Sequence, residues 1–263
     1  MLDQTLRHRP DSVVRRTIEP LAHPTMGDAM DDPGARRLAG WAGAASVVAF
    51  TAGVALCSLA GVDAPGTSDA VISQRLDDSP NQVAAGIGLP LLGVGSVLLL
   101  WFAAGLRRTL ERLSGGDPLT HVIVPAAAML GGLTITGVSL DTSSAITAFA
   151  ADEFVPDPDT ARVLGAAGLV VALAGLSGGA ALVAATTRIA QQARAIPRWA
   201  GWASYVVAAL CLTGFWNGGI ASVALALWLV GCAIGILRSD TTPEAPGTLG
   251  VDQASMSDSA QTT

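Results

Sequence analysis

Asp141 is the residue whose surroundings point most directly to chemistry. It is the one carboxylate in the run TITGVSLDTSSAITAF, residues 134–149, which is otherwise apolar, small or hydroxylic. A charge at the centre of a bilayer costs at least about 2.5–3.5 kcal/mol, so an ionisable group inside a span marks a candidate path for protons or ions. A proton-coupled or small-solute transporter that uses Asp141 is therefore one functional hypothesis.

The depth of Asp141 separates a transport role from a structural one. Counted from Leu119, it lies about 33 Å along a helix, which reaches the outer interface of a bilayer. A hydrocarbon boundary near Pro125 would instead bury Asp141 and extend the span to Ala150. We favour the interfacial position, with Arg162 or Asn217 as the partner of Asp141 and with a structural role for the carboxylate.

A second candidate is Ser177 in GLSGG, residues 175–179. This segment matches the GxSxG pattern of serine hydrolases and is similar to the GxSG of rhomboid intramembrane proteases, which also have six helices. A serine nucleophile needs a base within hydrogen-bond reach. The histidines are His8, His23 and His121, and none lies on the last span, where that family places its base. An intramembrane hydrolase is therefore the weakest hypothesis.

The remaining reactive residue types form no recognisable site. Cys57, Cys211 and Cys232 lie singly in apolar runs, as buried unpaired thiols do. The sequence contains no zinc motif, phosphate loop or dinucleotide fingerprint. We therefore expect no cofactor, no metal site, no catalytic residue and no nucleic-acid partner.

The elements that hold these residues are long and apolar. Hydrophobic residues make up 51% of the 263 and charged residues 14%, which is typical of a membrane protein. We predict an all-α, multi-pass bundle of six transmembrane helices at 38–238, between disordered tails at 1–37 and 239–263. Residues 68–80 fit either a short helix on the membrane surface or a solvated loop. The six spans are expected near 38–61, 84–106, 119–140, 161–187, 199–216 and 219–237.

Arginine placement predicts the orientation of the bundle. The connections after the second and fourth spans are rich in arginine, whereas the first and third loops hold eight acids and two arginines. By the positive-inside rule both termini are cytoplasmic, in a bacterial cytoplasmic (inner) membrane. Trp41, Trp199 and Trp202 open spans from the same side and fit the headgroup region.

Small residues predict where helices pack. Helices in lipid associate where small side chains let their backbones approach. The fourth span carries Gly165, Gly168, Gly175 and Gly179 at spacings of three to seven residues. Gly231 and Gly235 form a second four-residue pair on the sixth span. Both sets are expected to face a neighbouring helix.

Three segments resemble a known group of proteins. The order of LLLWFAAGLRRTLER, an acid-rich outer loop and AIPRWAGWASYV is similar to that of a family of uncharacterised six-helix actinobacterial integral membrane proteins. The likeness covers roughly residues 38–237. It implies a fold and a location, and it carries over no catalytic residue.

The sequence favours a non-enzymatic integral membrane protein that binds lipid or serves as an accessory subunit. Its expected partners are membrane lipids and another membrane protein or a second copy of itself. A transporter usually lines its midplane with several ionisable or amide groups. Apart from Asp141, this bundle offers mainly five hydroxyls, at Thr51, Ser96, Thr134, Ser177 and Thr213.

Overall fold

The computed structural model describes residues 33–61, 68–151 and 157–239, and these residues form helices without a strand. The sequence predicts disordered tails at 1–37 and 239–263. Residues 1–32 and 240–263 lie outside this description, whereas residues 33–37 and Ser239 belong to helices. The helices are α1 (Pro33–Ala60), α2 (Asp69–Asp77), α3 (Ser79–Ser114), α4 (Thr120–Ala150), α5 (Pro158–Gln192), α6 (Arg198–Leu212) and α7 (Gly214–Ser239).

Five helices are long and apolar enough to cross a membrane. They are α1, α3, α4, α5 and α7, and they confirm a helical bundle with the composition of a multi-pass membrane protein. Each of the first four spans predicted from sequence lies on one of these helices. Their apolar side chains remain largely uncovered by protein, as expected for helices that face lipid.

The fifth predicted span, 199–216, differs from the structure. α6 has 15 residues, about 22 Å of helix, and is therefore shorter than the roughly 30 Å of hydrocarbon in a bilayer. The chain reverses between Thr213 and Asn217, earlier than the predicted turn at residues 217–218. Asn217 has φ −144° and ψ 32° and forms a kink within α7.

Several helices extend past the apolar runs that predict them. α4 continues to Ala150 and α3 begins at Ser79, five residues before its predicted span. Capping residues define two other helix ends. Asp157 caps α5 by accepting hydrogen bonds from the backbone N–H of Thr160 at 3.0 Å and from its hydroxyl at 2.8 Å. Gly115, with φ 66°, ends α3 in the left-handed conformation that favours glycine.

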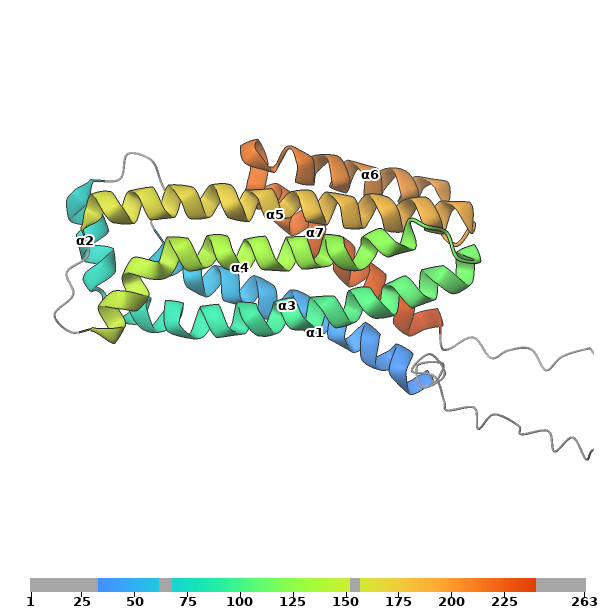
Figure 1. Ribbon diagram of the computed structural model, residues 1–263, viewed down its shortest axis with the longest axis horizontal. Coiled ribbons are helices and arrows are strands. Elements are labelled where there is room, and N and C mark those ends of the chain that lie inside the picture. The colour runs from blue at the N-terminus through green and yellow to red at the C-terminus, as the bar shows by residue number, and fades with distance from the viewer. Residues whose placement is uncertain (1–32, 62–67, 152–156, 240–263) are drawn as a thin grey trace, which may run out of the picture.

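Different elements lie at the two ends of the bundle (Figure 1). The short helix α2 lies across one end, which we call the α2 end. At the other end the start of α1 lies beside the end of α7, because Gly40 packs against Leu237 and Gly43 against Ala233. This arginine-rich end also holds the α3–α4 and α5–α6 connections, with Arg107, Arg108, Arg112, Arg188 and Arg194 in or beside them.

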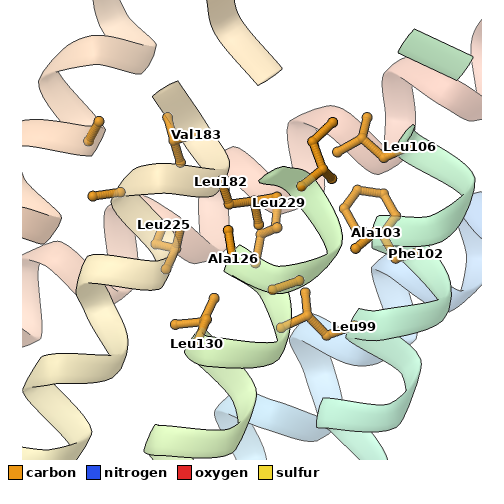
Figure 2. Packing of buried hydrophobic residues seen from close by; sticks show 14 of the residues in the cluster. Leu99, Phe102, Ala103, Leu106, Ala126, Leu130, Leu182, Val183, Leu225 and Leu229 are labelled. Atoms are coloured by element: carbon orange, nitrogen blue, oxygen red, sulfur yellow. The ribbon is translucent and has the colours of Figure 1, made fainter. Parts of the chain in front are cut away.

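The core lies between α3, α4, α5, α6 and α7 in the half of the bundle nearer the arginine-rich end. Figure 2 shows Phe102 of α3, Leu130 of α4 and Leu182 of α5 in one cluster of buried side chains, with Leu225 and Leu229 of α7 in the same cluster. Phe102 and Leu182 have no exposed surface. Cys57, Cys211 and Cys232 are unpaired, and Cys211 is part of this core.

Glycines bring α4 and α5 into backbone contact. A Cβ at Gly168 would collide with the carbonyl oxygen of Gly137, and one at Gly178 would lie 2.7 Å from that of Ala126. Gly165 is also buried on the α2 side of this stripe. The fourth predicted span therefore packs through its small residues, as the sequence indicates.

The glycine pair of α7 does not pack in this way. A Cβ at Gly231 or Gly235 would meet nothing within 4 Å, so neither residue faces another helix of the described chain. The buried face of α7 is formed instead by larger residues that lie on another side of the helix. These are Ala221, Leu225, Leu229, Ala233 and Ile236.

Candidate functional site

Asp141 lies where α1, α4 and α5 meet. Its carboxylate lies beside Gly61, directly after the end of α1, and a Cβ at Gly168 of α5 would come within 3.2 Å of the Asp141 Cβ. Glycine at both positions leaves room for this side chain. Relative to α1 the carboxylate is at the helix end, whereas α4 continues nine residues further to Ala150. Its interfacial depth in a membrane stays a prediction.

Arg162 joins α5 to α2. Its guanidinium forms an ion pair with Asp69 of α2 and a second with Asp159 at 2.9 Å. Beside it, hydrogen bonds from the Thr160 hydroxyl and backbone hold the pKa of Asp157 below its usual range. That cap is present at neutral pH and is lost as the pH falls through this lowered pKa.

Ile72 anchors α2 on the apolar side. It is 1% exposed and packs in a small cluster with residues of α1, α3, α4 and α5. Of the two forms predicted for residues 68–80, the helix is therefore present at Asp69–Asp77. It covers the helix ends next to Asp141. The other members of the cluster are Ala60, Ala85, Ala145 and Ala161.

Asn217 lies in a different part of the molecule from Asp141. In the amide orientation that satisfies both of its groups, its Nδ2 donates to the backbone carbonyls of Thr213 and Leu210, each at 3.3 Å, within the α6–α7 turn. Gly214 and Gly218 of this turn pack against Leu176 and Leu173, near the middle of α5. The structure thus brings Asp141 together with Gly61, which follows α1, and with Gly168 of α5, and it places Asn217 farther along α5.

Three hydroxyls of the bundle, those of Ser96, Thr134 and Ser177, bond within their own helices. Ser96 donates to the carbonyl of Leu92 at 3.0 Å, and Thr134 donates to that of Leu130 at 2.7 Å. Ser177 likewise donates to Ala174 at 2.8 Å. These groups satisfy their donors one turn back along the same helix and do not join one another in a polar chain. This arrangement favours structural roles for them.

His121 belongs to a polar cluster between α3 and α4 at the arginine-rich end. Arg107 donates through Nε to Glu111 at 2.7 Å, and its Nη2 lies 3.0 Å from Nδ1 of His121. Thr120 lies 3.5 Å from the same Glu111 oxygen. The cluster ties the two helices across their connection. His121 is the one histidine among the described residues, and it lies in this cluster, away from Ser177.

An open apolar groove lies between α1 and α3. Its volume is about 460 Å³. Along α1 it extends from Trp41 to Ala52, a rise of about 16 Å, and this equals roughly one leaflet of a 30 Å hydrocarbon layer. We call it the α1–α3 groove. It is lined by Trp41, Ala44, Ala45, Val48, Ala49, Ala52, Leu91 and Leu98.

Sequence reasoning did not predict this groove. The available signal was a face of small residues on the first span, because Trp41, Ala45 and Ala52 share one side of a helix at spacings of four and seven. The contribution of α3 could not be read from this pattern. Leu91 and Leu98 enter the groove only because α3 packs beside α1 through Gly53 and Gly95.

Comparisons of the chain with protein-family models, with curated proteins and with solved structures found no match. Its function is therefore inferred from its own geometry.

Proposed function

We propose that this chain is a non-enzymatic, lipid-binding protein of a bacterial cytoplasmic membrane, and that the α1–α3 groove holds one acyl chain. The observation that carries this proposal is the groove itself. Its walls are aliphatic except for Trp41, and its length along α1 equals about one leaflet. An acyl chain matches both the chemistry and the length of this surface.

The polar groups of the bundle support this proposal over transport or hydrolysis. The hydroxyls of Ser96, Thr134 and Ser177 donate to carbonyls of their own helices. Asp141 lies among glycines near the α2 end, away from the groove. We assign Asp141 to the packing of α1, α4 and α5.

Groove-filling variants test the proposal. Ala45→Phe and Ala52→Phe put a ring where the acyl chain would lie, and Ala167→Phe is the control because Ala167 is an exposed residue of α5 outside the groove. Native mass spectrometry of protein purified in mild detergent then measures retained phospholipid. We expect the wild type and Ala167→Phe to retain one phospholipid and the groove variants to lose it. Equal retention in all four proteins would contradict the proposal.

The proposed orientation places the arginine-rich end in the cytoplasm. This follows from the positive-inside rule. Trp199 and Trp202, which are 74% and 73% exposed at that end, fit the headgroup region there. In a version without the native cysteines, single cysteines at Ser68 and Ser114 would be labelled in intact cells with an impermeant maleimide. Reaction at position 68 alone is expected. Reaction at position 114 would reverse the orientation.

A further inference from the structure

We propose that the α1–α3 groove selects a phospholipid with a net negative headgroup, which binds at arginines beside the Trp41 end of the groove. This inference rests on the proposed lipid-binding function and adds the class of lipid. It requires that the groove have one charged end and one uncharged end.

Arg37 provides the first cationic group. It precedes Trp41 by four residues, so the two side chains lie on neighbouring positions of one α1 face, with Arg37 one turn nearer the arginine-rich end. Its side chain is exposed. An acyl chain lying from Ala52 toward Trp41 would therefore place its headgroup near this guanidinium.

Arg108 provides the second cationic group. α1 and α3 touch beside the Trp41 end, since a Cβ at Gly105 would collide with Ala39. Arg108 follows Gly105 by three residues, about one turn. Its Nη1 atom is buried and has no hydrogen-bond partner among the residues that the structure describes. A buried guanidinium N–H without an acceptor is costly, and a phosphate oxygen is a strong acceptor.

The acid nearest to Arg108 in sequence is already engaged. Glu111 binds Arg107 at 2.7 Å, on the side of α3 where Arg107 meets His121 of α4. Arg112 follows Leu98 and Gly105 at intervals of seven residues and so adds a third arginine on the α3 face that continues the groove. The Trp41 end is thus cationic, whereas the lining between Ala44 and Ala52 is aliphatic.

These features favour an anionic headgroup over a zwitterionic one. A phosphatidylcholine headgroup carries its own ammonium, which offsets its phosphate near a cluster of arginines. A phosphatidylglycerol headgroup has no such cation. Basic pockets at the cytoplasmic ends of membrane helices bind anionic lipids for this reason. With Arg37 alone contributing about 1 kcal/mol, we expect at least about fivefold selection for the anionic lipid.

The test compares two lipids with identical acyl chains. Delipidated protein in mild detergent is titrated with phosphatidylglycerol and with phosphatidylcholine, and bound lipid is measured by native mass spectrometry. We expect the wild type to bind the glycerol lipid at least about fivefold more tightly. Arg37→Gln should reduce this ratio about fivefold, and Arg37→Lys should retain most of it because the charge remains. Arg194→Gln is the matched control, since Arg194 is an exposed arginine in the α5–α6 connection.

The possible outcomes separate this inference from the function on which it rests. If both lipids bind equally and Ala45→Phe abolishes both, the groove binds acyl chains and the headgroup inference is wrong. If neither lipid binds the wild type, the proposed function fails with it. If Arg194→Gln lowers the ratio as much as Arg37→Gln does, the preference arises from overall charge and the assigned headgroup position is wrong.

Discussion

The glycines of α5 and those of α7 follow similar spacings, yet they lie in opposite environments. At Gly168, Gly175 and Gly178 the backbone or side chains of α4 occupy the space where a Cβ would be. At Gly231 and Gly235 that space is open. The α5 glycines set the distance between two helices, whereas the α7 pair contacts no helix of the described chain. Glycines at helical spacings thus permit close packing without specifying it.

The sharpest test of this comparison is Gly168→Leu. Its Cβ would collide with the Gly137 carbonyl and crowd the backbone of Asp141, where no flexible side-chain end can move aside. Overpacking a core typically costs about 1–3 kcal/mol, and we expect a loss of at least 3 kcal/mol or failure to fold. Thermal unfolding in detergent measures the effect. Wild-type stability in this variant would show that α4 and α5 are not in close contact.

Gly231→Leu is the counterpart on α7. With nothing within 4 Å of its Cβ, the new side chain should extend into lipid and change the free energy of unfolding by less than about 0.5 kcal/mol. The same melting assay measures it. A loss as large as that of Gly168→Leu would break the comparison, because it would require a neighbour for α7 outside the described chain.

Alanine substitutions at Gly175 and Gly179 compare two contacts of α5, the first with α4 and the second with α7. The Gly175 Cβ would lie 3.0 Å from the Thr134 hydroxyl and 3.2 Å from the Leu130 carbonyl. The Gly179 Cβ would lie 2.8 Å from a methyl of Leu225, which can rotate. We expect Gly175→Ala to cost about 1–3 kcal/mol and Gly179→Ala less. The reverse order in thermal unfolding would mean that α7 constrains α5 more rigidly than α4 does.

Ser204→Ala tests how the inner face of α7 is held. The Trp228 indole donates to the Ser204 hydroxyl at 3.0 Å and joins α6 to α7. Removing the acceptor should cost about 1 kcal/mol. Ser222→Ala is the control, since its exposed hydroxyl bonds to Gly218 within α7. Equal melting temperatures for the two variants would show that this bond contributes nothing to the hairpin.

Asp141→Asn should have the smallest effect. The amide keeps the shape that Gly61 and Gly168 accommodate, so stability should change by less than about 0.5 kcal/mol. Proton and solute flux is then measured in proteoliposomes containing the wild type or the variant. We expect no flux in either. Flux in the wild type that is lost in the folded variant would make Asp141 a transport residue.

The sequence predicts the helices better than it predicts their contacts. Apolar runs locate α1, α3, α4 and α5 because hydrophobic length is a local property of the chain. The end of α6 at Leu212 could not be located this way, since the apolar run continues through Trp216. The partners of glycines are not local either. Only the folded bundle shows that Gly231 faces away from the other helices while Gly168 meets α4.

The candidate sites show the same limit. Asp141 stands out in sequence because a lone carboxylate in an apolar run is unusual, but its neighbours Gly61 and Gly168 are distant in the chain. The expected partner Arg162 binds Asp69. Asp69 lies on a segment for which the sequence allowed either a helix or a loop. The α1–α3 groove has no reactive residue to mark it. Its alanines are ordinary in a membrane helix and become a feature only beside Leu91 and Leu98.

The short α6 has a consequence for the surrounding bilayer. Its turn packs near the middle of α5, so the α6–α7 side of the bundle is shorter than the side formed by α3 and α4. Trp216 in this turn is 86% exposed, as suits a residue at a lipid headgroup. A protein whose hydrophobic length differs between two sides fits a bilayer that is thinner on one of them. A difference between hydrophobic length and bilayer thickness costs fractions of a kcal/mol per Å. We therefore expect this chain to be more stable in lipids with shorter acyl chains and to concentrate in the thinner regions of a mixed membrane.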